Sequence, residues 1–166
     1  MGKPLPNFAF IDSQSIHLGI QALGWKLDWH KFRVYLRDKY RVARAYLFIG
    51  YLPQNQRLYT TLQQKGHILV FKPVLQRGSG APKGNVDADL VLRAMIDFPD
   101  YARAVVVTSD GDFYSLIEYL YQNGKLEVVL SPSTGTCSAL LKKSARERIH
   151  FLETLRSKLE HAPRKK

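Results

Sequence analysis

The 166-residue chain is poor in cysteine and contains no long hydrophobic run. Its single cysteine, Cys137, excludes an internal disulfide and a cysteine-rich zinc site, and it suits a reducing compartment. No apolar stretch approaches the ~20 residues that span a bilayer. The N-terminal sequence M-G-K-P-L-P-N also lacks the apolar core of a signal peptide. We therefore expect a cytoplasmic protein with no membrane partner.

Acidic residues are also scarce. Aspartate and glutamate together number 14, against 25 lysines and arginines, which gives a net charge of +11. Such an excess attracts polyanions, and nucleic acid is the commonest polyanion that proteins bind. Basic surfaces also serve solubility, so composition favours a nucleic-acid partner and leaves the second explanation open. Composition does not decide whether the protein forms a homo-oligomer.

Short apolar runs rich in branched and aromatic residues predict buried β-strands. They are Phe8 to Ile11, Ala43 to Ile49, Ile68 to Phe71, Ala104 to Thr108 and Leu126 to Leu130. The runs are continuous, not alternating, so both faces of the sheet should be covered. Helical patterns lie between them, as in the stripe formed by Trp29, Phe32, Leu36 and Tyr40. This alternation predicts a three-layered α/β/α fold, Rossmann-like, with a mostly parallel central sheet.

No repeat or linker divides the chain, and 45% hydrophobic residues are ample for one core. We predict a single domain over residues 1–166, with a core over about 7–141 and a C-terminal helical segment over about 145–161. Leucines at 152, 155 and 159 are spaced for one face of that helix. A short strand at Ile149 to Phe151 is an alternative beginning for the segment.

Aspartates follow the predicted strands where the strands end. Asp12 follows the first strand in F-A-F-I-D-S-Q-S, and Asp110 and Asp112 follow the fourth in V-V-V-T-S-D-G-D-F. Asp87 opens a helix in K-G-N-V-D-A-D-L-V-L. Ligands of open parallel sheets bind at the carboxyl ends of the strands. We therefore expect these carboxylates to share one site.

Helical spacing separates Asp87 from its neighbour Asp89. Asp87 shares a stripe with Val91, Ala94 and Phe98, so it should point toward the sheet from the first turn. Asp89 instead starts a ladder of charges four residues apart, through Arg93 to Asp97, which is typical of a solvated face. We assign Asp87 to the site and Asp89 to the surface.

Each of these aspartates has an ordinary structural explanation when taken alone. Asp112 is placed to cap the helix that begins at Phe113, Asp110 to form a turn, and Asp12 to bind backbone amides. Asp87 is favoured by the helix dipole. Carboxylates gathered within a few ångströms repel one another, however, and almost require a hard cation such as Mg²⁺ or Mn²⁺. Such a site fits phosphodiester hydrolysis, because the cation neutralises the phosphate and activates a water.

Basic and hydroxyl side chains near the predicted site are candidates for binding nucleic acid. Arg77 and Lys83 lie in the irregular stretch from Pro73 to Asn85, whose length is typical of functional or disordered loops. The sequence S-P-S-T-G-T-C-S after the fifth strand supplies hydroxyls, among them Ser131 and Thr136, that suit a phosphate oxygen. Hydroxyl clusters are also common in ordinary turns and caps.

Three elements in this order, I-D-S-Q-S-I-H, K-G-N-V-D-A-D-L-V-L and V-V-V-T-S-D-G-D-F, resemble the NYN domain family of PIN-like nucleases. The likeness covers about Asn7 to Leu141 and is strongest to the LabA-like bacterial branch. The resemblance implies a PIN-like fold and metal-dependent cleavage of RNA. It also implies that the metal-binding and catalytic carboxylates correspond to Asp12, Asp87, Asp110 and Asp112.

Two residues depart from the family pattern. Ser15 stands where the family usually has asparagine, three residues after the first aspartate, and Ser109 stands where it often has glycine. Neither change removes a carboxylate, and both hydroxyls are placed to contact the nucleic acid. We predict a Mg²⁺- or Mn²⁺-dependent endoribonuclease that acts on single-stranded RNA. The alternative is a module of the same fold that binds nucleic acid, or regulates, and cuts weakly or not at all.

Overall fold

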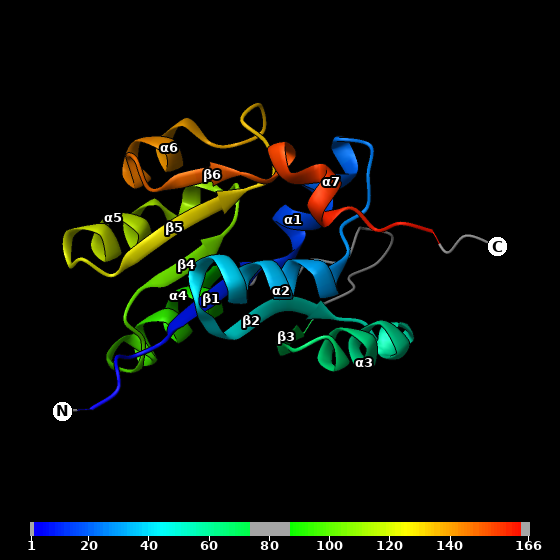
Figure 1. The fold of residues 1–166 in the computed structure, drawn as a ribbon, viewed down its shortest axis with the longest axis horizontal. Helices are drawn as coiled ribbons and strands as arrows, with labels where there is room; N and C mark the ends of the chain where they lie inside the picture. The colour runs from blue at the N-terminus through cyan, green and yellow to red at the C-terminus, as the bar shows by residue number, and fades with distance from the viewer. Residues whose placement is uncertain (1, 74–86, 164–166) are drawn as a thin grey trace.

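The computed structural model describes residues 2–73 and 87–163, in which six parallel strands form one sheet in the order β3-β2-β1-β4-β5-β6. The strands are β1 (Asn7–Asp12), β2 (Val42–Tyr51), β3 (His67–Pro73), β4 (Ala104–Val107), β5 (Leu126–Ser131) and β6 (Ile149–Phe151). Figure 1 shows helices on both faces of this sheet. The predicted three-layered α/β/α architecture is confirmed.

The helices divide between the two faces of the sheet according to the strands that they connect. They are α1 (Ser13–Ala22), α2 (Trp29–Tyr40), α3 (Gln56–Gln64), α4 (Asp87–Ile96), α5 (Tyr114–Gln122), α6 (Ala139–Ala145) and α7 (Arg156–Leu159). Short 3-10 turns are η1 (Pro53–Asn55), η2 (Phe98–Asp100), η3 (Gly111–Phe113) and η4 (Leu152–Leu155). Helices α1, α2, α3 and α7 contribute to one core, and α4, α5 and α6 contribute to the other.

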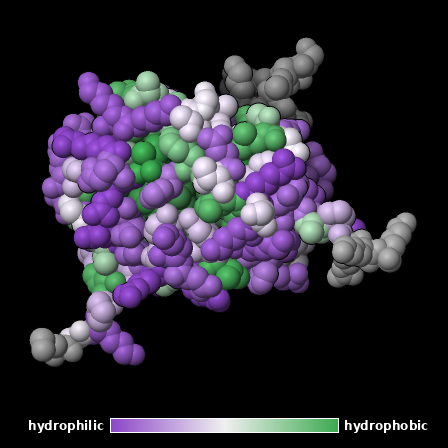
Figure 2. Space-filling view, turned by 45° about the horizontal axis from the view of Figure 1, so that its top comes forward, coloured by the Kyte–Doolittle hydropathy of each residue, from purple (hydrophilic) through white to green (hydrophobic). Residues whose placement is uncertain are grey.

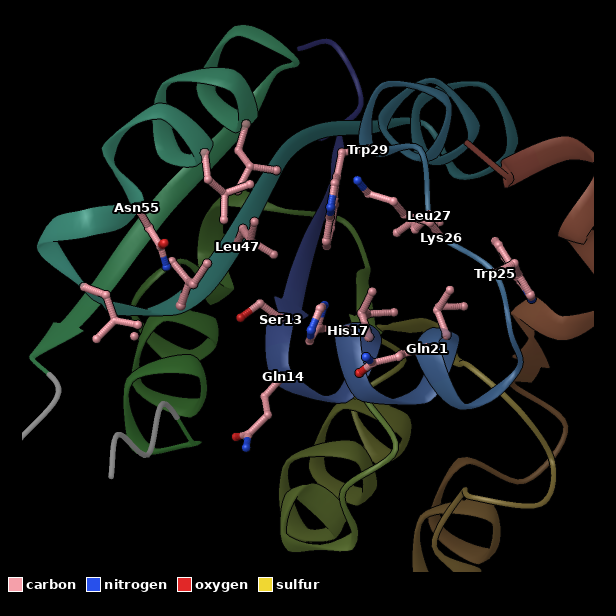
Figure 3. Close-up of a pocket in the computed structure, with 17 residues that line it drawn as sticks. Ser13, Gln14, His17, Gln21, Trp25, Lys26, Leu27, Trp29, Leu47 and Asn55 are labelled. Carbon is pink, nitrogen blue, oxygen red and sulfur yellow. The ribbon is translucent and has the colours of Figure 1, made fainter. Parts of the chain in front are cut away.

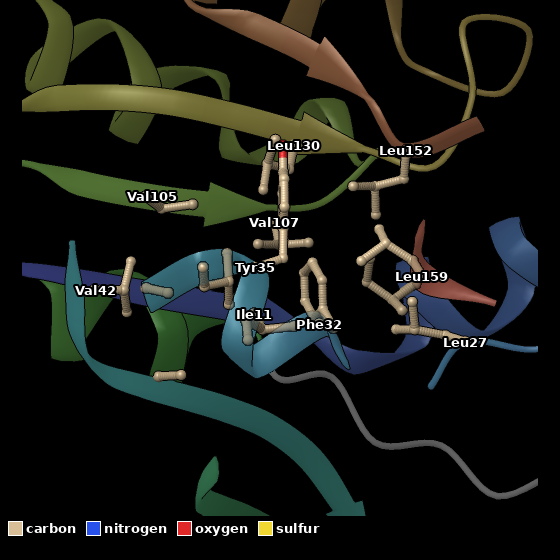
Figure 4. Packing of buried hydrophobic residues seen from close by; sticks show 14 of the residues in the cluster. Ile11, Leu27, Phe32, Tyr35, Val42, Val105, Val107, Leu130, Leu152 and Leu159 are labelled. Carbon is tan, nitrogen blue, oxygen red and sulfur yellow. The ribbon is translucent and has the colours of Figure 1, made fainter. Parts of the chain in front are cut away.

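Alternate residues of each strand enter different cores, because successive side chains point to opposite faces of a sheet. Ile11 of β1 and Val107 of β4 lie in the first core with Phe32 of α2 (Figure 4). Their neighbours Phe10 and Val106 lie in the second core. All five side chains are fully buried. This two-sided burial explains why the strands read as continuous apolar runs.

The direction of the chain reverses between β1 and β4, which lie side by side. From β1 the chain moves outward through β2 to β3, and after α4 it returns to β4 and moves outward through β5 to β6. Loops therefore diverge at the carboxyl ends of β1 and β4, where open α/β sheets bind ligands. The paired residues Ile11 and Val107 bring Asp12 and Thr108 to this edge.

Two details of the fold differ from the sequence prediction. The third strand lies at the edge of the sheet, so Ile68 and Phe71 are 43% and 39% exposed, where both were expected to be buried. The segment 145–161 is not one helix, since it contains β6, η4 and only the short helix α7. Strand β6 pairs with β5 and confirms the alternative of a short strand at Ile149 to Phe151, and the leucines at 152, 155 and 159 lie after it in η4 and α7. Leu152 and Leu159 are nevertheless buried, in the first core.

Hydrophilic residues cover most of the face shown in Figure 2, with hydrophobic side chains gathered near its centre. No helix within residues 2–73 and 87–163 has both the length and the apolar character needed to cross a membrane.

Candidate metal centre

Three aspartates from separate elements meet at the carboxyl edge of the sheet. Asp12 ends β1, Asp87 begins α4, and Asp110 follows β4. Each offers a carboxylate oxygen, and the three oxygens all lie within 4.8 Å of one another. Asp12 is 4% exposed, and the other two are half-buried. The structure therefore brings together three of the four aspartates that the sequence indicated.

Asp12 is held in place by the beginning of helix α1, which it caps. Its Oδ1 accepts from the backbone N–H of Ser15 at 3.4 Å, and its Oδ2 accepts from the Ser15 hydroxyl at 2.7 Å. Capping satisfies one of the orphan amides of the helix. The ordinary explanation of Asp12 as a residue that binds backbone amides is thus correct, and it coexists with the cluster. Ser15 orients this carboxylate.

Thr108 links Asp12 to Asp110, and its importance was missed in the sequence. Its hydroxyl is fully buried and donates to Asp12 Oδ2 at 3.0 Å. The Thr108 hydroxyl oxygen also accepts from the backbone N–H of Asp110 at 3.1 Å and lies 3.3 Å from the Ser15 hydroxyl. The available signal was position, because Thr108 is a polar residue at the end of the predicted strand that Asp110 follows.

Asp110 caps the next turn, and Asp112 stands outside the cluster. Asp110 Oδ1 accepts from the Asp112 backbone N–H at 2.9 Å. The alternative that Asp112 caps the helix is wrong, because α5 begins without a side-chain cap. Asp112 is exposed and is not one of the three clustered aspartates. Gly111 between them is required by close packing, because a Cβ there would collide with the side chain of Ser138. Only glycine lets η3 lie so close to α6.

The electrostatics of the cluster are those of crowded anions. Burial and, in decreasing order of influence, the carboxylates of Asp110, Asp12 and Asp112 together raise the pKa of Asp87 to about 6. Lys72, at the end of β3, opposes them. Three convergent carboxylate oxygens that disfavour one another's charge suit a hard divalent cation, which takes oxygen ligands and relieves the repulsion. The residues present therefore fit Mg²⁺ or Mn²⁺.

The other residues indicated by the sequence lie in varied positions. Ser109 is half-buried, and its carbonyl accepts from the backbone N–H of Ser138 at 3.2 Å. Ser131 is fully buried at the end of β5, so its hydroxyl does not reach the surface. Thr136 is exposed, and its hydroxyl lies 2.7 Å from that of Ser133. Arg77 and Lys83 lie outside the described residues.

The expected ladder of charges on α4 forms only in part. Arg93 lies 3.8 Å from Asp97 Oδ1, as the spacing of four residues predicts. Asp89 is half-buried, and Asp97 is only 6% exposed, although both were assigned to a solvated face. Asp97 lies just after the end of α4, where the chain turns into η2 toward the second core, and helical spacing no longer decides its burial.

A family model for the NYN domain matches residues 8–153, which include every aspartate of the cluster. The chain belongs to the NYN domain family. NYN domains are generally nucleases and typically depend on a divalent metal ion. A nucleic acid is thus the expected substrate class of this NYN domain, and the acidic cluster is compatible with that chemistry. The resemblance seen in the sequence motifs is confirmed at the level of the family.

A solved structure of the same fold comes from Vibrio parahaemolyticus and is described as a protein of unknown function. It aligns with this NYN domain at a TM-score of 0.72 and 23% sequence identity, over 88% of this chain and 93% of that chain. The likeness supports the fold alone. The comparison with curated proteins gave no match.

Proposed function

We propose that this NYN domain is a metal-dependent endoribonuclease of the LabA-like branch, which hydrolyses phosphodiester bonds of single-stranded RNA. The observation that carries the proposal is the convergence of Asp12, Asp87 and Asp110 at the switch point of the sheet. Three carboxylates in a chain of net charge +11 form a local reversal of sign. Such a reversal disfavours a polyanion unless a cation mediates the contact.

The three aspartates would hold Mg²⁺ or Mn²⁺, which when bound neutralises a phosphate and lowers the pKa of a water. Ser15 and Thr108 fix the orientation of Asp12 through the hydrogen bonds described above. Such supporting partners tune a metal site almost as strongly as its ligands. The exposed Asp112 lies close enough to influence Asp87 and adds to the negative potential at the entrance.

Cationic and hydroxyl side chains around the carboxylates would grip the RNA backbone. The charge of Lys72, near the end of β3, lowers the pKa of Asp87, and Arg77 and Lys83 follow Lys72 in the sequence. The hydroxyls of Ser109 and Thr136 are further candidates, and buried Ser131 is not. If these cations contact phosphates, log affinity should fall against log salt by about 0.7 per phosphate for a single strand.

Cleavage of a labelled single-stranded RNA with Mg²⁺ or Mn²⁺ tests the activity, and RNA binding in EDTA separates it from the alternative. The proposal expects cleavage with either ion and none in EDTA. RNA binding without cleavage under both ions would favour the module that binds and does not cut. Unchanged binding after Lys72→Ala, Arg77→Ala and Lys83→Ala together would refute the proposed grip.

A further inference from the structure

A hollow of about 730 Å³ lies beside the acidic cluster, among α1, the carboxyl half of β2, α3 and the segment before α2 (Figure 3). Its volume falls within the roughly 300–1,000 Å³ of typical small-ligand pockets. Ser13 lines it and directly follows Asp12 in the chain. The pocket therefore extends to the beginning of α1, one residue from Asp12 of the cluster.

The walls of this pocket are apolar and aromatic. Leu47 of β2 forms part of the floor, and Trp29 and His17 point toward one another from α2 and α1 (Figure 3). The indole of Trp29 is held at fixed angles by its edge contacts with Phe32, at 6.1 Å and 73°, and with His67, at 5.4 Å and 87°. The indole and the imidazole are rigid aromatic rings, which provide stacking surfaces for a flat aromatic ligand.

Polar groups stand at the edges of the apolar walls. Ser13, Gln21, Lys26 and Asn55 are among the residues that line the pocket. An amide offers both a donor and an acceptor, which is the pattern needed to read the edge of a base. A purely apolar ligand would leave these groups without a role. The combination of flat walls, polar edges and a cation matches a nucleobase attached to a phosphate backbone.

We propose that this pocket binds one unstacked nucleobase of the RNA strand, next to the phosphate that lies at the acidic cluster. The inference rests on the proposed ribonuclease function. A base is joined to its flanking phosphates through one sugar, and Ser13 of the pocket directly follows Asp12 of the cluster, so one short single strand would contact both sites. A base inside a duplex is stacked and paired, so the pocket selects for unpaired RNA.

The two tryptophans of the chain, Trp25 and Trp29, both line the pocket, so intrinsic fluorescence reports its occupancy. The probes are short oligoadenylate and oligouridylate strands in EDTA, with an abasic strand of equal length and charge. We expect saturable quenching by the two base-containing strands and none by the abasic strand. The abasic strand should also bind roughly 5- to 150-fold more weakly, since base stacking on an aromatic side chain is lost.

His17→Ala removes one proposed stacking wall at an exposed position and should weaken binding of the base-containing strands alone. Leu18→Ala is the matched control, because Leu18 is 53% exposed on the same helix and does not line the pocket. Equal binding of abasic and base-containing strands, with no quenching and no effect of His17→Ala, would overturn the inference.

The outcomes for the pocket and for the nuclease are distinguishable. Cleavage that depends on the aspartates, without base-dependent quenching, would contradict base binding in the pocket and support the nuclease function. Base-dependent quenching without cleavage under either metal ion would support the pocket and remove the nuclease. Quenching by a detergent micelle, with none by RNA, would mean that the pocket binds an apolar ligand instead of a base.

Discussion

The Thr108 hydroxyl donates a 3.0 Å hydrogen bond to Asp12 Oδ2, across 96 positions of sequence and between neighbouring strands. The same hydroxyl oxygen accepts the backbone N–H of Asp110 at 3.1 Å. One buried group thus sets the relative position of two aspartates of the cluster. Satisfied buried hydrogen bonds of this kind rigidify a site.

Thr108→Val should weaken Mn²⁺ binding and cleavage by roughly 10- to 100-fold, the usual effect of losing a partner that orients a ligand. The substitution keeps the shape of the side chain and removes the hydroxyl, while the hydrogen bond from Ser15 to Asp12 Oδ2 remains. Mn²⁺ titration followed by thermal unfolding measures the affinity. Thr61→Val is the matched control, since that hydroxyl makes an exposed bond on α3. Unchanged Mn²⁺ affinity in Thr108→Val would show that Thr108 has no such role.

The sequence allowed the sheet and the choice of aspartates to be predicted for physical reasons. The strands are buried on both faces, so their apolar runs identify them directly, and a carboxylate after such a run must lie at the edge. Thr108 was missed because a threonine at the end of a strand is unremarkable until the register places it opposite Asp12. The edge position of β3 likewise depends on pairing between distant segments, which local patterns do not reveal.

Gly111→Ala should reduce metal affinity and destabilise the fold by about 1–3 kcal/mol, because overpacking forces neighbours apart. The added Cβ would meet the side chain of Ser138 and displace the turn that holds Asp110. Denaturant unfolding and Mn²⁺ titration measure the two effects. Combining Gly111→Ala with Ser138→Gly removes the obstacle, at only a small capping cost to α6. If the double variant is no better than the single one, steric conflict is not the cause.

Asp87→Asn should stabilise the metal-free protein at neutral pH. Burial and the neighbouring carboxylates raise the pKa of Asp87 to about 6, above the ordinary value of 3.8. The ionised group is therefore unfavourable in the folded state, and this penalty is largest above pH 6 and fades as the pH falls toward 4. Urea unfolding in EDTA at neutral and acidic pH measures it.

With Mn²⁺ present, the parent should become more stable than Asp87→Asn, because an ion that binds only the folded state stabilises the parent by mass action. Asp38→Asn is the control, since Asp38 is exposed, pairs with Arg37 and lies on α2 away from the cluster. Lower stability of Asp87→Asn than of the parent in EDTA above pH 6 would contradict the account of crowded anions.

His67 should make the protein less stable in mild acid. Its Nε2 donates to the Trp29 carbonyl at 3.0 Å, and buried Nδ1 has no hydrogen-bond partner within the described residues. Burial lowers the pKa of His67 from 6.5 to about 4. As the pH falls, the unfolded chain binds a proton at His67 near pH 6.5, whereas the folded chain binds it only near pH 4. The free energy of unfolding therefore decreases between pH 6.5 and pH 4.

Between pH 7.5 and pH 5 we expect the parent to lose about 2 kcal/mol of unfolding free energy from His67. His67→Phe should be less stable overall, yet should lose that much less over the same interval. Urea unfolding at the two pH values gives the comparison, with His150→Phe at an exposed site as the control. Equal losses in the parent and in His67→Phe would mean that His67 does not cause the effect.

Less of the candidate site than of the fold could be predicted from the sequence. Asp112 was expected among the ligands because D-G-D places two carboxylates together, but the turn around Gly111 turns one inward and leaves the other exposed. Lys72 near the end of β3 was not predicted to belong to the site, although its charge lowers the pKa of Asp87 in the folded protein. The pocket lined by Trp29 and His17 depends on residues from five separate elements, which are α1, α2, β2, η1 and α3. Spacing along the chain could not assemble it.

Cleavage of labelled single-stranded RNA by the parent, Asp110→Asn and Asp38→Asn tests the central claim most directly. Each substitution removes one negative charge, at the cluster in the first variant and on the exposed face of α2 in the second. We predict that the parent and Asp38→Asn cleave with Mg²⁺ or Mn²⁺, and that Asp110→Asn does not, although it binds RNA in EDTA at least as tightly as the parent because a repulsive charge is gone. Undiminished cleavage by Asp110→Asn would contradict the account.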